Sequence, residues 1–202
     1  MKNEIGIVDI GYGNIGSVYN AVEFLGFKPN LEKKIENLKK YSHLILPGVG
    51  SFAVNSQILQ KNGWHGELKN FIQKGSYIFG ICVGMQMMFE EGSEGGNNKG
   101  LGVFHGSCNK FDSDLVIPHI GFNTVEHNNT KIWNNIPNLS SFYFVHSFRV
   151  EETNNEYKFC KTEYGEKFIS FIEKDNVYGS QFHPEKSHTP GLKLLQNFLN
   201  LE

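Results

Sequence analysis

The stretch 77–89, Tyr-Ile-Phe-Gly-Ile-Cys-Val-Gly-Met-Gln-Met-Met-Phe, constrains the fold of this chain more than any other. Aromatic and β-branched residues precede Cys82 and predict a buried strand, whereas the unbranched apolar run at 85–89 predicts a helix. Cys82 is therefore expected at a strand-to-helix corner. Gly80 and Gly84, two residues to either side, supply the small neighbours that such a strained corner needs.

A corner of this kind can activate a thiol. It would place the Cys82 sulfur at the N-terminal end of a helix, where the helix dipole and unpaired N–H groups favour thiolate over thiol. The backbone N–H of Val83 would point to where an oxyanion forms. These five residues alone are equally compatible with a small apolar cysteine packed at the end of a strand.

Length and charge limit the class of protein. The chain has 202 residues, which fits one α/β domain with a full core, expected to span residues 1–202. A formal net charge of -2 gives no electrostatic reason to expect nucleic acid or an anionic membrane as a partner. The N-terminus enters a strand pattern directly, with no signal peptide, and no apolar run approaches the length of a membrane span. We therefore predict a cytoplasmic protein.

The cysteines do not predict a disulfide framework, because Cys82, Cys108 and Cys160 are odd in number and scattered. His105 and Cys108 have a spacing that suits one helix face, but no second pair with metal-ligand spacing accompanies them. No metal site is predicted.

The N-terminal glycines resemble a dinucleotide fingerprint. A strand pattern at 4–10 is followed by Gly-Tyr-Gly-Asn-Ile-Gly at 11–16 and by a helical pattern at 18–25. The acidic residue that should end a second strand is poorly supported, because segment 27–30 is short, polar and contains a proline. A tight turn between strand and helix is therefore favoured over NAD binding.

The segment 43–52 predicts an apolar strand that ends in a second glycine turn. Pro47 is expected to end the ladder of this strand, and Gly48 and Gly50 allow the peptides beside Val49 to reorient at little cost. Such a loop can offer backbone N–H groups to an anion. Taken alone, it is better explained as an ordinary turn.

The remaining pattern predicts an α/β fold. Strands and helices alternate in the first half and strands follow one another in the second, which favours a central parallel sheet extended by antiparallel strands. Helices are predicted at 35–41, at 53–74 with a break near Gly63, and at 193–201; a polar loop at 90–100; and strands at 115–117, 124–127, 142–145, 157–162, 168–172 and 177–182.

A candidate base lies in Gln-Phe-His-Pro-Glu-Lys-Ser at 181–187. Pro184 is expected to exclude helix and to keep His183 extended, so that His183 and Glu185 share a face. A histidine held by a carboxylate is the usual base of nucleophilic catalysis, although a lone surface histidine is common. Together with Cys82 and the glycine turn, these residues predict a covalent acyl-transfer site.

Five segments in order resemble the class I (triad) glutamine amidotransferases, and within them the glutaminase subunits of imidazole glycerol phosphate synthase. The resemblance implies a three-layer α/β fold with a mixed, mostly parallel central sheet and an antiparallel extension, and no cofactor. The segments are Pro-Gly-Val-Gly-Ser-Phe at 47–52, Gly-Ile-Cys-Val-Gly-Met-Gln at 80–86, Pro-His-Ile-Gly-Phe-Asn at 118–123, Tyr-Phe-Val-His-Ser at 143–147 and the segment at 181–187.

The family chemistry assigns a role to each reactive residue. The resemblance implies that Cys82 attacks the side-chain amide of L-glutamine, His183 shuttles the proton and Glu185 orients His183. Ammonia then leaves from a γ-glutamyl thioester that water hydrolyses. The N–H groups of Val49 and Val83 would form the oxyanion hole, after a peptide flip at Val49 where one is needed. A deprotonated thiol with a neutral His183 predicts activity that rises with pH through the neutral range.

The family also implies a substrate pocket and a partner. Glu94 would meet the ammonium group of glutamine. The partner would be a cyclase subunit with a (β/α)8 barrel, forming a heterodimer through which ammonia travels. The residues implied are Gly48, Gly50, Gln86, Glu94, Ser147 and Phe148 for the substrate, and Asn14, Phe122 and Lys186 for the partner interface.

One departure bears on the partner. The family usually has His-Met-Gly-Trp-Asn where this chain has His-Ile-Gly-Phe-Asn at 119–123, on the partner-facing side. This leaves open a paralogous subunit that supplies ammonia for amination of a surface sugar. Two alternatives of another class rest on other features: a free-standing γ-glutamyl thiol hydrolase on the same cysteine corner, and a non-enzymatic dinucleotide-binding or assembly module on the N-terminal glycines.

Overall fold

A seven-stranded sheet forms the centre of the molecule. The computed structural model describes residues 4–11, 14–48, 50–111, 114–154 and 156–202, and the strand order is β11-β12-β13-β4-β3-β1-β2. Five neighbouring strands are parallel, and the two strands at the β11 end of the sheet pair antiparallel. The predicted mixed, mostly parallel sheet is therefore confirmed. The parallel strands are β1 (Ile5–Val8), β2 (Pro29–Glu32), β3 (His43–Gly48), β4 (Tyr77–Cys82) and β13 (Val177–Ser180); β12 (Glu166–Lys174) and β11 (Lys158–Tyr164) are antiparallel.

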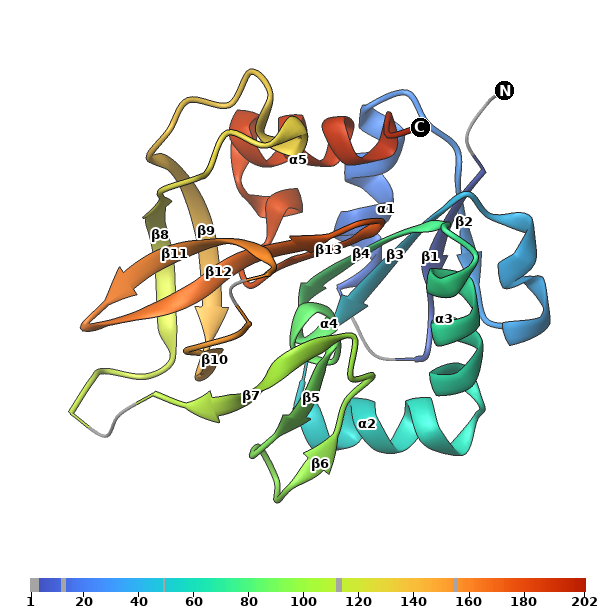
Figure 1. The fold of residues 1–202 in the computed structure, drawn as a ribbon. Helices are drawn as coiled ribbons and strands as arrows, with labels where there is room; N and C mark the ends of the chain where they lie inside the picture. The colour runs from blue at the N-terminus through green and yellow to red at the C-terminus, as the bar shows by residue number, and fades with distance from the viewer. Residues whose placement is uncertain (1–3, 12–13, 49, 112–113, 155) are drawn as a thin grey trace.

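Helices cover both faces of this sheet. Helices α1 (Ile15–Phe24) and α5 (His188–Leu199) lie on one face, and α2 (Phe52–Lys61) and α3 (Trp64–Gln73) on the other (Figure 1). The crossover from β1 to β2 and that from β3 to β4 run in opposite directions along the sheet. Because both are right-handed, their helices must lie on opposite faces. The three-layer arrangement follows.

Smaller elements surround the central sheet. Two further sheets and four short helical segments are present in the described part of the chain. The four-stranded sheet holds β10 (Phe148–Val150), β7 (Phe104–Lys110), β5 (Phe89–Gly92) and β6 (Asn98–Lys99); the two-stranded sheet holds β8 (His119–Val125) and β9 (Ser140–His146); and the short segments are α4 (Val83–Gln86), η1 (Ile35–Lys40), η2 (Lys131–Trp133) and η3 (Pro184–Lys186).

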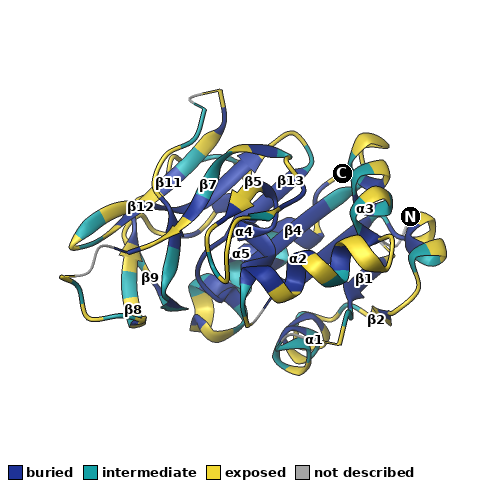
Figure 2. Ribbon diagram, turned by 90° about the horizontal axis from the view of Figure 1, so that it is seen from below, coloured by how far each residue is buried: buried dark blue, intermediate teal, exposed yellow. Residues whose placement is uncertain are grey.

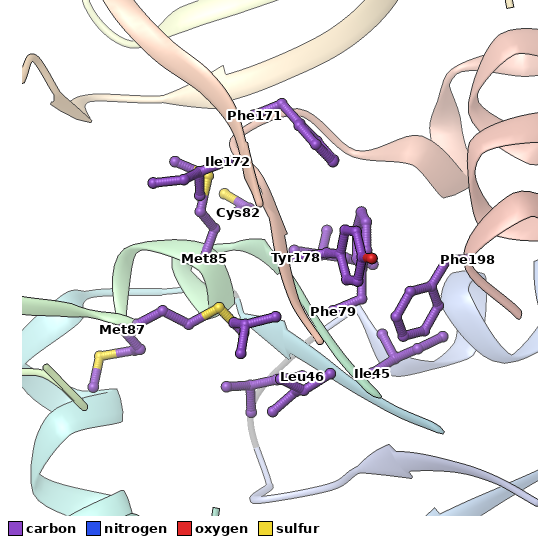
Figure 3. Packing of buried hydrophobic residues seen from close by; sticks show 14 of the residues in the cluster. Ile45, Leu46, Phe79, Cys82, Met85, Met87, Phe171, Ile172, Tyr178 and Phe198 are labelled. Atoms are coloured by element: carbon purple, nitrogen blue, oxygen red, sulfur yellow. The ribbon is translucent and has the colours of Figure 1, made fainter. Parts of the chain in front are cut away.

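Aromatic side chains of the core pack on β4 from the face that α5 covers. The inner strands of the central sheet, β1, β3, β4 and β13, are buried along nearly all of their length, whereas the edge strands β2 and β11 are partly exposed (Figure 2). Phe79 of β4 packs against Phe171 of β12 and Phe198 of α5, with ring centroids 6.3 and 5.2 Å apart (Figure 3). Aromatic pairs of this kind contribute about 0.5–1.5 kcal/mol beyond the area they bury. They fix the strand whose last residue is Cys82. The single domain expected for residues 1–202 stays a prediction.

The second strand of the N-terminal unit is present, contrary to our expectation. Pro29 is tolerated because it is the first residue of an edge strand, where no ladder N–H is required. The strand even ends in an acid, Glu32, but its carboxylate accepts hydrogen bonds from the N–H of Lys34 at 2.8 Å and the hydroxyl of Tyr41 at 2.9 Å. These bonds give Glu32 a structural role. Tyr12 and Gly13 of the fingerprint lie outside the described residues.

Two prolines behave differently from prediction. Pro47 does not end β3, which pairs with β4 as far as Gly48. On the other side of β3, the pairing with β1 ends at Ile45, so the missing N–H of Pro47 costs no hydrogen bond to β1. Pro184 does not exclude a helical turn but begins η3, where its missing N–H would be unpaired anyway.

Several boundaries also differ. The helix after Cys82 ends at Gln86, and strands β5 and β6 occupy part of the predicted loop at 90–100. Residues 115–117 are not a strand, β7 and β10 were not predicted, and α5 begins five residues before 193. The break near Gly63 between two helices is confirmed, with Gly63 at φ 76°. In the described part of the chain, every helix is too short or too polar to cross a bilayer.

Candidate active site

Cys82 occupies the predicted corner between β4 and α4. Its backbone has φ 55° and ψ -113°, a conformation that residues with side chains rarely adopt. A Cβ on Gly84 would overlap the carbonyl oxygen of Leu46, and one on Gly80 would overlap the carbonyl of Gly84. The two glycines are therefore required by close backbone packing, as the sequence predicted.

Sheet register brings three strand ends to this corner. Gly48 of β3 pairs with Cys82, and Ser180 of β13 pairs with Ile81 of β4. Because these strands are parallel, the segment after β13 leaves the sheet beside the sulfur. That segment carries His183, whose N–H donates to the carbonyl of Tyr143 at 2.9 Å.

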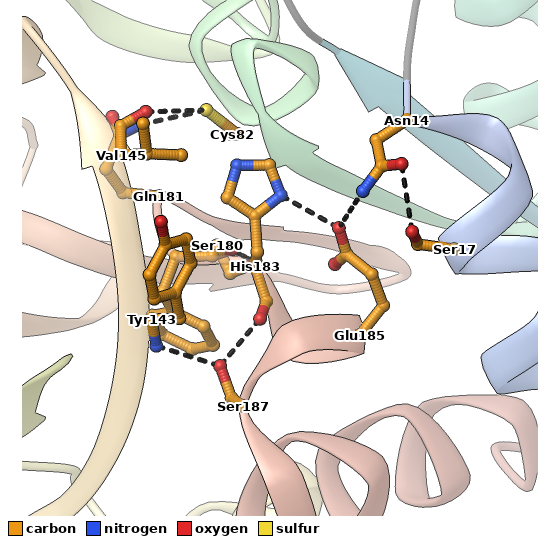
Figure 4. A network of polar contacts seen from close by, with 11 residues as sticks. Asn14, Ser17, Cys82, Tyr143, Val145, Ser180, Gln181, His183, Glu185 and Ser187 are labelled. Atoms are coloured by element: carbon orange, nitrogen blue, oxygen red, sulfur yellow. Dashed lines mark hydrogen bonds and ion pairs between the residues drawn. The ribbon is translucent and has the colours of Figure 1, made fainter. Parts of the chain in front are cut away.

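His183 and Glu185 form a buried pair. The Nδ1 of His183 lies 2.8 Å from Oε1 of Glu185, and the two side chains are 3% and 0% exposed. The same carboxylate oxygen accepts a weaker hydrogen bond, 3.5 Å, from the side-chain amide of Asn14. The imidazole lies between the carboxylate and Cys82 (Figure 4). The pairing predicted for His183 and Glu185 is thus present. His183 is extended as predicted, with φ -98° and ψ 96°, but Glu185 lies in the helical turn η3.

The sulfur has two further neighbours. The side-chain amide of Gln181 donates to Sγ of Cys82 at 3.7 Å, and the carbonyl oxygen of Val145 lies 4.0 Å from it (Figure 4). Burial lowers the pKa of His183, but hydrogen bonds and charge from Cys82 and Glu185 raise it more, to about 10. This corrects the expected neutral His183: beside the Cys82 sulfur and the Glu185 carboxylate, the imidazole is held as imidazolium.

A cavity of about 360 Å³ opens onto Cys82. This volume suits a small-molecule ligand. Three lining residues were not predicted, namely Pro118, Val145 and His146. The predicted residues that line it are Gly50, Cys82, Val83, Gln86, Glu94, Ser147, Phe148, His183 and Lys186.

Comparison with known proteins decides the family. The family model "Glutamine amidotransferase class-I" matches residues 7–201. The chain belongs to the class I glutamine amidotransferases. It is 40% identical over 195 residues to "Imidazole glycerol phosphate synthase subunit HisH" of Caldanaerobacter subterraneus subsp. tengcongensis, covering 96% of each chain. Such identity over such a length places it among the HisH subunits.

Two further matches extend this result. "Imidazole glycerol phosphate synthase hisHF" of Schizosaccharomyces pombe is 39% identical over 203 residues, which cover 96% of this chain and 38% of that protein. Among solved structures, "Structure of PurLQS from Thermotoga maritima" superposes with a TM-score of 0.78, covering 99% of both chains at 20% identity. The structural match supports the fold of this amidotransferase.

Glu94 of this amidotransferase links the cavity to the second glycine turn. Its Oε2 accepts from the N–H of Phe52 at 2.7 Å, at the first residue of α2, where the helix dipole favours a carboxylate. Gly48 does not line the cavity; it packs against the backbone of Val83 and Gly84. Val49 lies outside the described residues.

The predicted partner residues lie close to the triad. Phe122 of β8 is 50% exposed, stacks on His188 at 5.3 Å and meets the Tyr143 ring edge-on. The Lys186 ammonium lies 5.8 Å from the centroid of the same Tyr143 ring. Asn14 contacts Glu185, as described above. These side chains therefore adjoin the reactive pair, which suits an interface that communicates with it.

Sequence reasoning missed a pair of buried histidines. Nδ1 of His119 lies 3.2 Å from Nε2 of His146, whose Nδ1 lies 2.8 Å from the carbonyl oxygen of Phe148. Burial lowers the pKa of His119 to about 4 and that of His146 to about 3. Both stand in segments that carry the family resemblance, but nothing in the sequence pairs them. No group of three metal-ligating side chains occurs within the described ranges.

Proposed function

We propose that this chain hydrolyses L-glutamine to glutamate and ammonia, as the glutaminase subunit of an imidazole glycerol phosphate synthase in histidine biosynthesis. The observation that carries the proposal is that Cys82 and His183 line one cavity, with Glu185 hydrogen-bonded to His183. Residues 82 and 183 are remote along the chain, and few sites other than a nucleophilic one bring a thiol, an imidazole and a carboxylate into line.

The first half-reaction uses the ion pair. The Cys82 thiolate attacks the side-chain amide carbon of glutamine, and the oxyanion that forms accepts hydrogen bonds from the N–H groups of Val83 and Val49. The His183 imidazolium donates its proton to the amide nitrogen, so that ammonia leaves and a γ-glutamyl thioester remains. Glu185 keeps the ring oriented and stabilises its charge.

The second half-reaction restores the ion pair of Cys82 and His183. Neutral His183 takes a proton from water, the hydroxide attacks the thioester carbon, and the carbon–sulfur bond breaks to give glutamate and thiolate. The sum is glutamine plus water to glutamate plus ammonia. Glu94 would bind the substrate ammonium, and Gly50, Gln86, Ser147 and Phe148 would surround the rest of the molecule, while Gly48 would support the cavity wall from behind through its contact with Val83 and Gly84.

The ammonia is proposed to pass to a cyclase subunit. The match covers only 38% of the fission yeast relative, imidazole glycerol phosphate synthase hisHF. We infer that the rest of that protein does the work that a separate cyclase subunit does for this chain. We propose a heterodimer with a (β/α)8-barrel cyclase that contacts Asn14, Phe122 and Lys186. A cytoplasmic location stays a prediction. The names of the relatives do not favour the surface-sugar subunit or the free-standing γ-glutamyl hydrolase.

The experiment is a reconstitution of this chain with a histidine-pathway cyclase subunit. Cys82→Ala should abolish glutamine-dependent formation of imidazole glycerol phosphate and leave the ammonium-dependent reaction unchanged. Cys160→Ala is the matched control, because that thiol is buried far along the chain from the site and should leave both reactions unchanged. Glutamine-dependent turnover by Cys82→Ala would contradict the proposal, as would full glutaminase activity of the isolated chain.

A further inference from the structure

Gln181 is a fully buried side chain that the family chemistry described above does not use. It follows β13 and precedes His183 by two residues, and its exposed fraction is 0%. Its amide nitrogen donates to Sγ of Cys82 at 3.7 Å. A buried amide turned toward a reactive sulfur requires an explanation, because either end of the amide could face it.

The neighbours of Gln181 determine which end faces the sulfur. The carbonyl oxygen of Phe148 can only accept, so Gln86 must present its Nε2 there, at 3.1 Å. The same Nε2 then faces Oε1 of Gln181 at 2.9 Å. With its oxygen occupied by this bond, Gln181 has only its N–H groups to offer to Cys82.

The buried histidines hold the other end of this series. His146 donates through Nδ1 to the carbonyl of Phe148, so a neutral His146 accepts at Nε2 from Nδ1 of His119. The carbonyl of Phe148 thus receives two donors and is fixed in place. The direction of every bond from His119 to the sulfur is therefore determined.

We propose that Gln181 is a further catalytic group of this site: its amide N–H binds the Cys82 sulfur and stabilises the thiolate. The carbonyl oxygen of Val145, 4.0 Å from the sulfur, can accept only from S–H, and so favours the thiol. The amide N–H of Gln181 has the opposite effect and favours the thiolate, because a hydrogen bond to a charged sulfur is stronger than one to a neutral sulfur. The inference rests on the proposed role of Cys82 as nucleophile.

The contribution of Gln181 can be separated from that of the charges around it, because its amide does not titrate. His183 is coupled to the sulfur by charge and hydrogen bonding, and Glu185 acts on it through His183. The remaining titratable or charged groups that face the sulfur or its cavity are Glu94 and Lys186, with His146 on β9 and Cys108 on β7.

The test is the pH dependence of Cys82 alkylation by iodoacetamide, measured on the full chain without glutamine and located by peptide mass spectrometry. Gln181→Met keeps the length of the side chain and removes the donor. We expect its alkylation midpoint to rise by about one pH unit, which corresponds to a roughly tenfold lower thiolate fraction at fixed acidic pH. Gln86→Met, which removes the anchor alone, should shift the midpoint in the same direction by less.

The control is Gln73→Met, the same change at an exposed position of α3, which should leave the midpoint unchanged. An unchanged midpoint in a folded Gln181→Met overturns the proposal. If that variant fails to fold, Gln86→Met decides, and an unchanged midpoint there overturns it equally. Because alkylation requires no turnover, this result is independent of the Cys82→Ala reconstitution that tests the proposed function.

Discussion

The Nδ1 atom of His183 lies 2.8 Å from Oε1 of Glu185, and the second carboxylate oxygen, Oε2, is buried without a hydrogen-bond partner among the described residues. A buried carboxylate that is not fully hydrogen-bonded depends on the charge beside it. The imidazolium supplies that charge. The pair therefore stabilises the state in which His183 is protonated and Glu185 is ionised. The same hydrogen bond also fixes the orientation of the His183 ring.

Glu185→Gln should lower glutamine-dependent turnover by about 10²-fold or more, because the imidazolium loses its counter-charge and the ring loses its fixed tautomer. The measurement is kcat with glutamine in the reconstituted complex. Ammonium-dependent turnover should be unchanged, since it bypasses the thiol. Wild-type kcat in this variant would mean that Glu185 does not orient the base.

The raised pKa of His183 predicts an alkaline limit to glutaminase activity. Below about pH 10 the imidazolium persists and can protonate the leaving ammonia; above it this acid is lost, so kcat/KM should fall. Glu185→Gln should move that alkaline limb to lower pH. The initial rate of glutamate release over a pH series tests this, and a limb that does not move would contradict it.

The raised pKa of His183 also predicts that the folded state loses stability as pH rises, whereas in acid denaturation stability is lost as pH falls. The folded-state pKa of His183 lies above the value of about 6.5 in an unfolded chain. Its contribution is therefore fully present below about pH 6.5 and is lost as pH rises through the folded pKa. Denaturant unfolding should show a loss of stability between these limits that His183→Gln makes smaller. An equal slope in both proteins would argue against the ion pair.

Gly84→Ala should destabilise the protein strongly, because the new methyl group would overlap the Leu46 carbonyl and force β3 away from α4. Overpacking of this kind costs about 1–3 kcal/mol. Gly16→Ala in α1 is the matched control: no atom lies within 4 Å of its added Cβ, and alanine is the better helix former. Chemical denaturation of both variants tests the difference. Equal stabilities would show that the corner is not closely packed.

The local part of the site could be predicted from sequence, since it depends on residues a few positions apart. Gly80 and Gly84 signal the corner because no other residue fits there, and the His-Pro-Glu sequence signals the pair at residues 183 and 185. What the sequence does not encode locally is the parallel pairing of β4 with β13, which brings the sulfur and the imidazole together. That contact came from family resemblance and not from periodicity.

The errors have a common physical origin. Residues 115–117 have strand-forming side chains but no neighbouring strand to pair with, whereas β7 contains Gly106, Ser107 and Asn109 and is a strand because β5 and β10 flank it. Strand formation here depends on pairing more than on intrinsic preference. Gln181 was overlooked for the same reason, because its role depends on two neighbours that are distant in sequence.

The only arginine of the chain predicts a coupling between stability and substrate binding. Arg149 is 7% exposed and donates from Nε and Nη2 to the two oxygens of Glu166, each at 2.9 Å, which ties β10 to β12. Phe148, whose carbonyl anchors Gln86, is the preceding residue. Arg149→Met should therefore lower the free energy of unfolding by about 1–3 kcal/mol.

In the same variant the KM for glutamine should rise more than kcat falls, since the cavity wall shifts while the triad stays. Arg149→Lys should recover little of either loss, because an ammonium cannot make the paired planar contact. Urea denaturation and steady-state kinetics on the reconstituted complex measure both quantities. A stability loss with an unchanged KM would show that the Arg149–Glu166 pair supports the fold alone, without positioning Phe148 for the substrate.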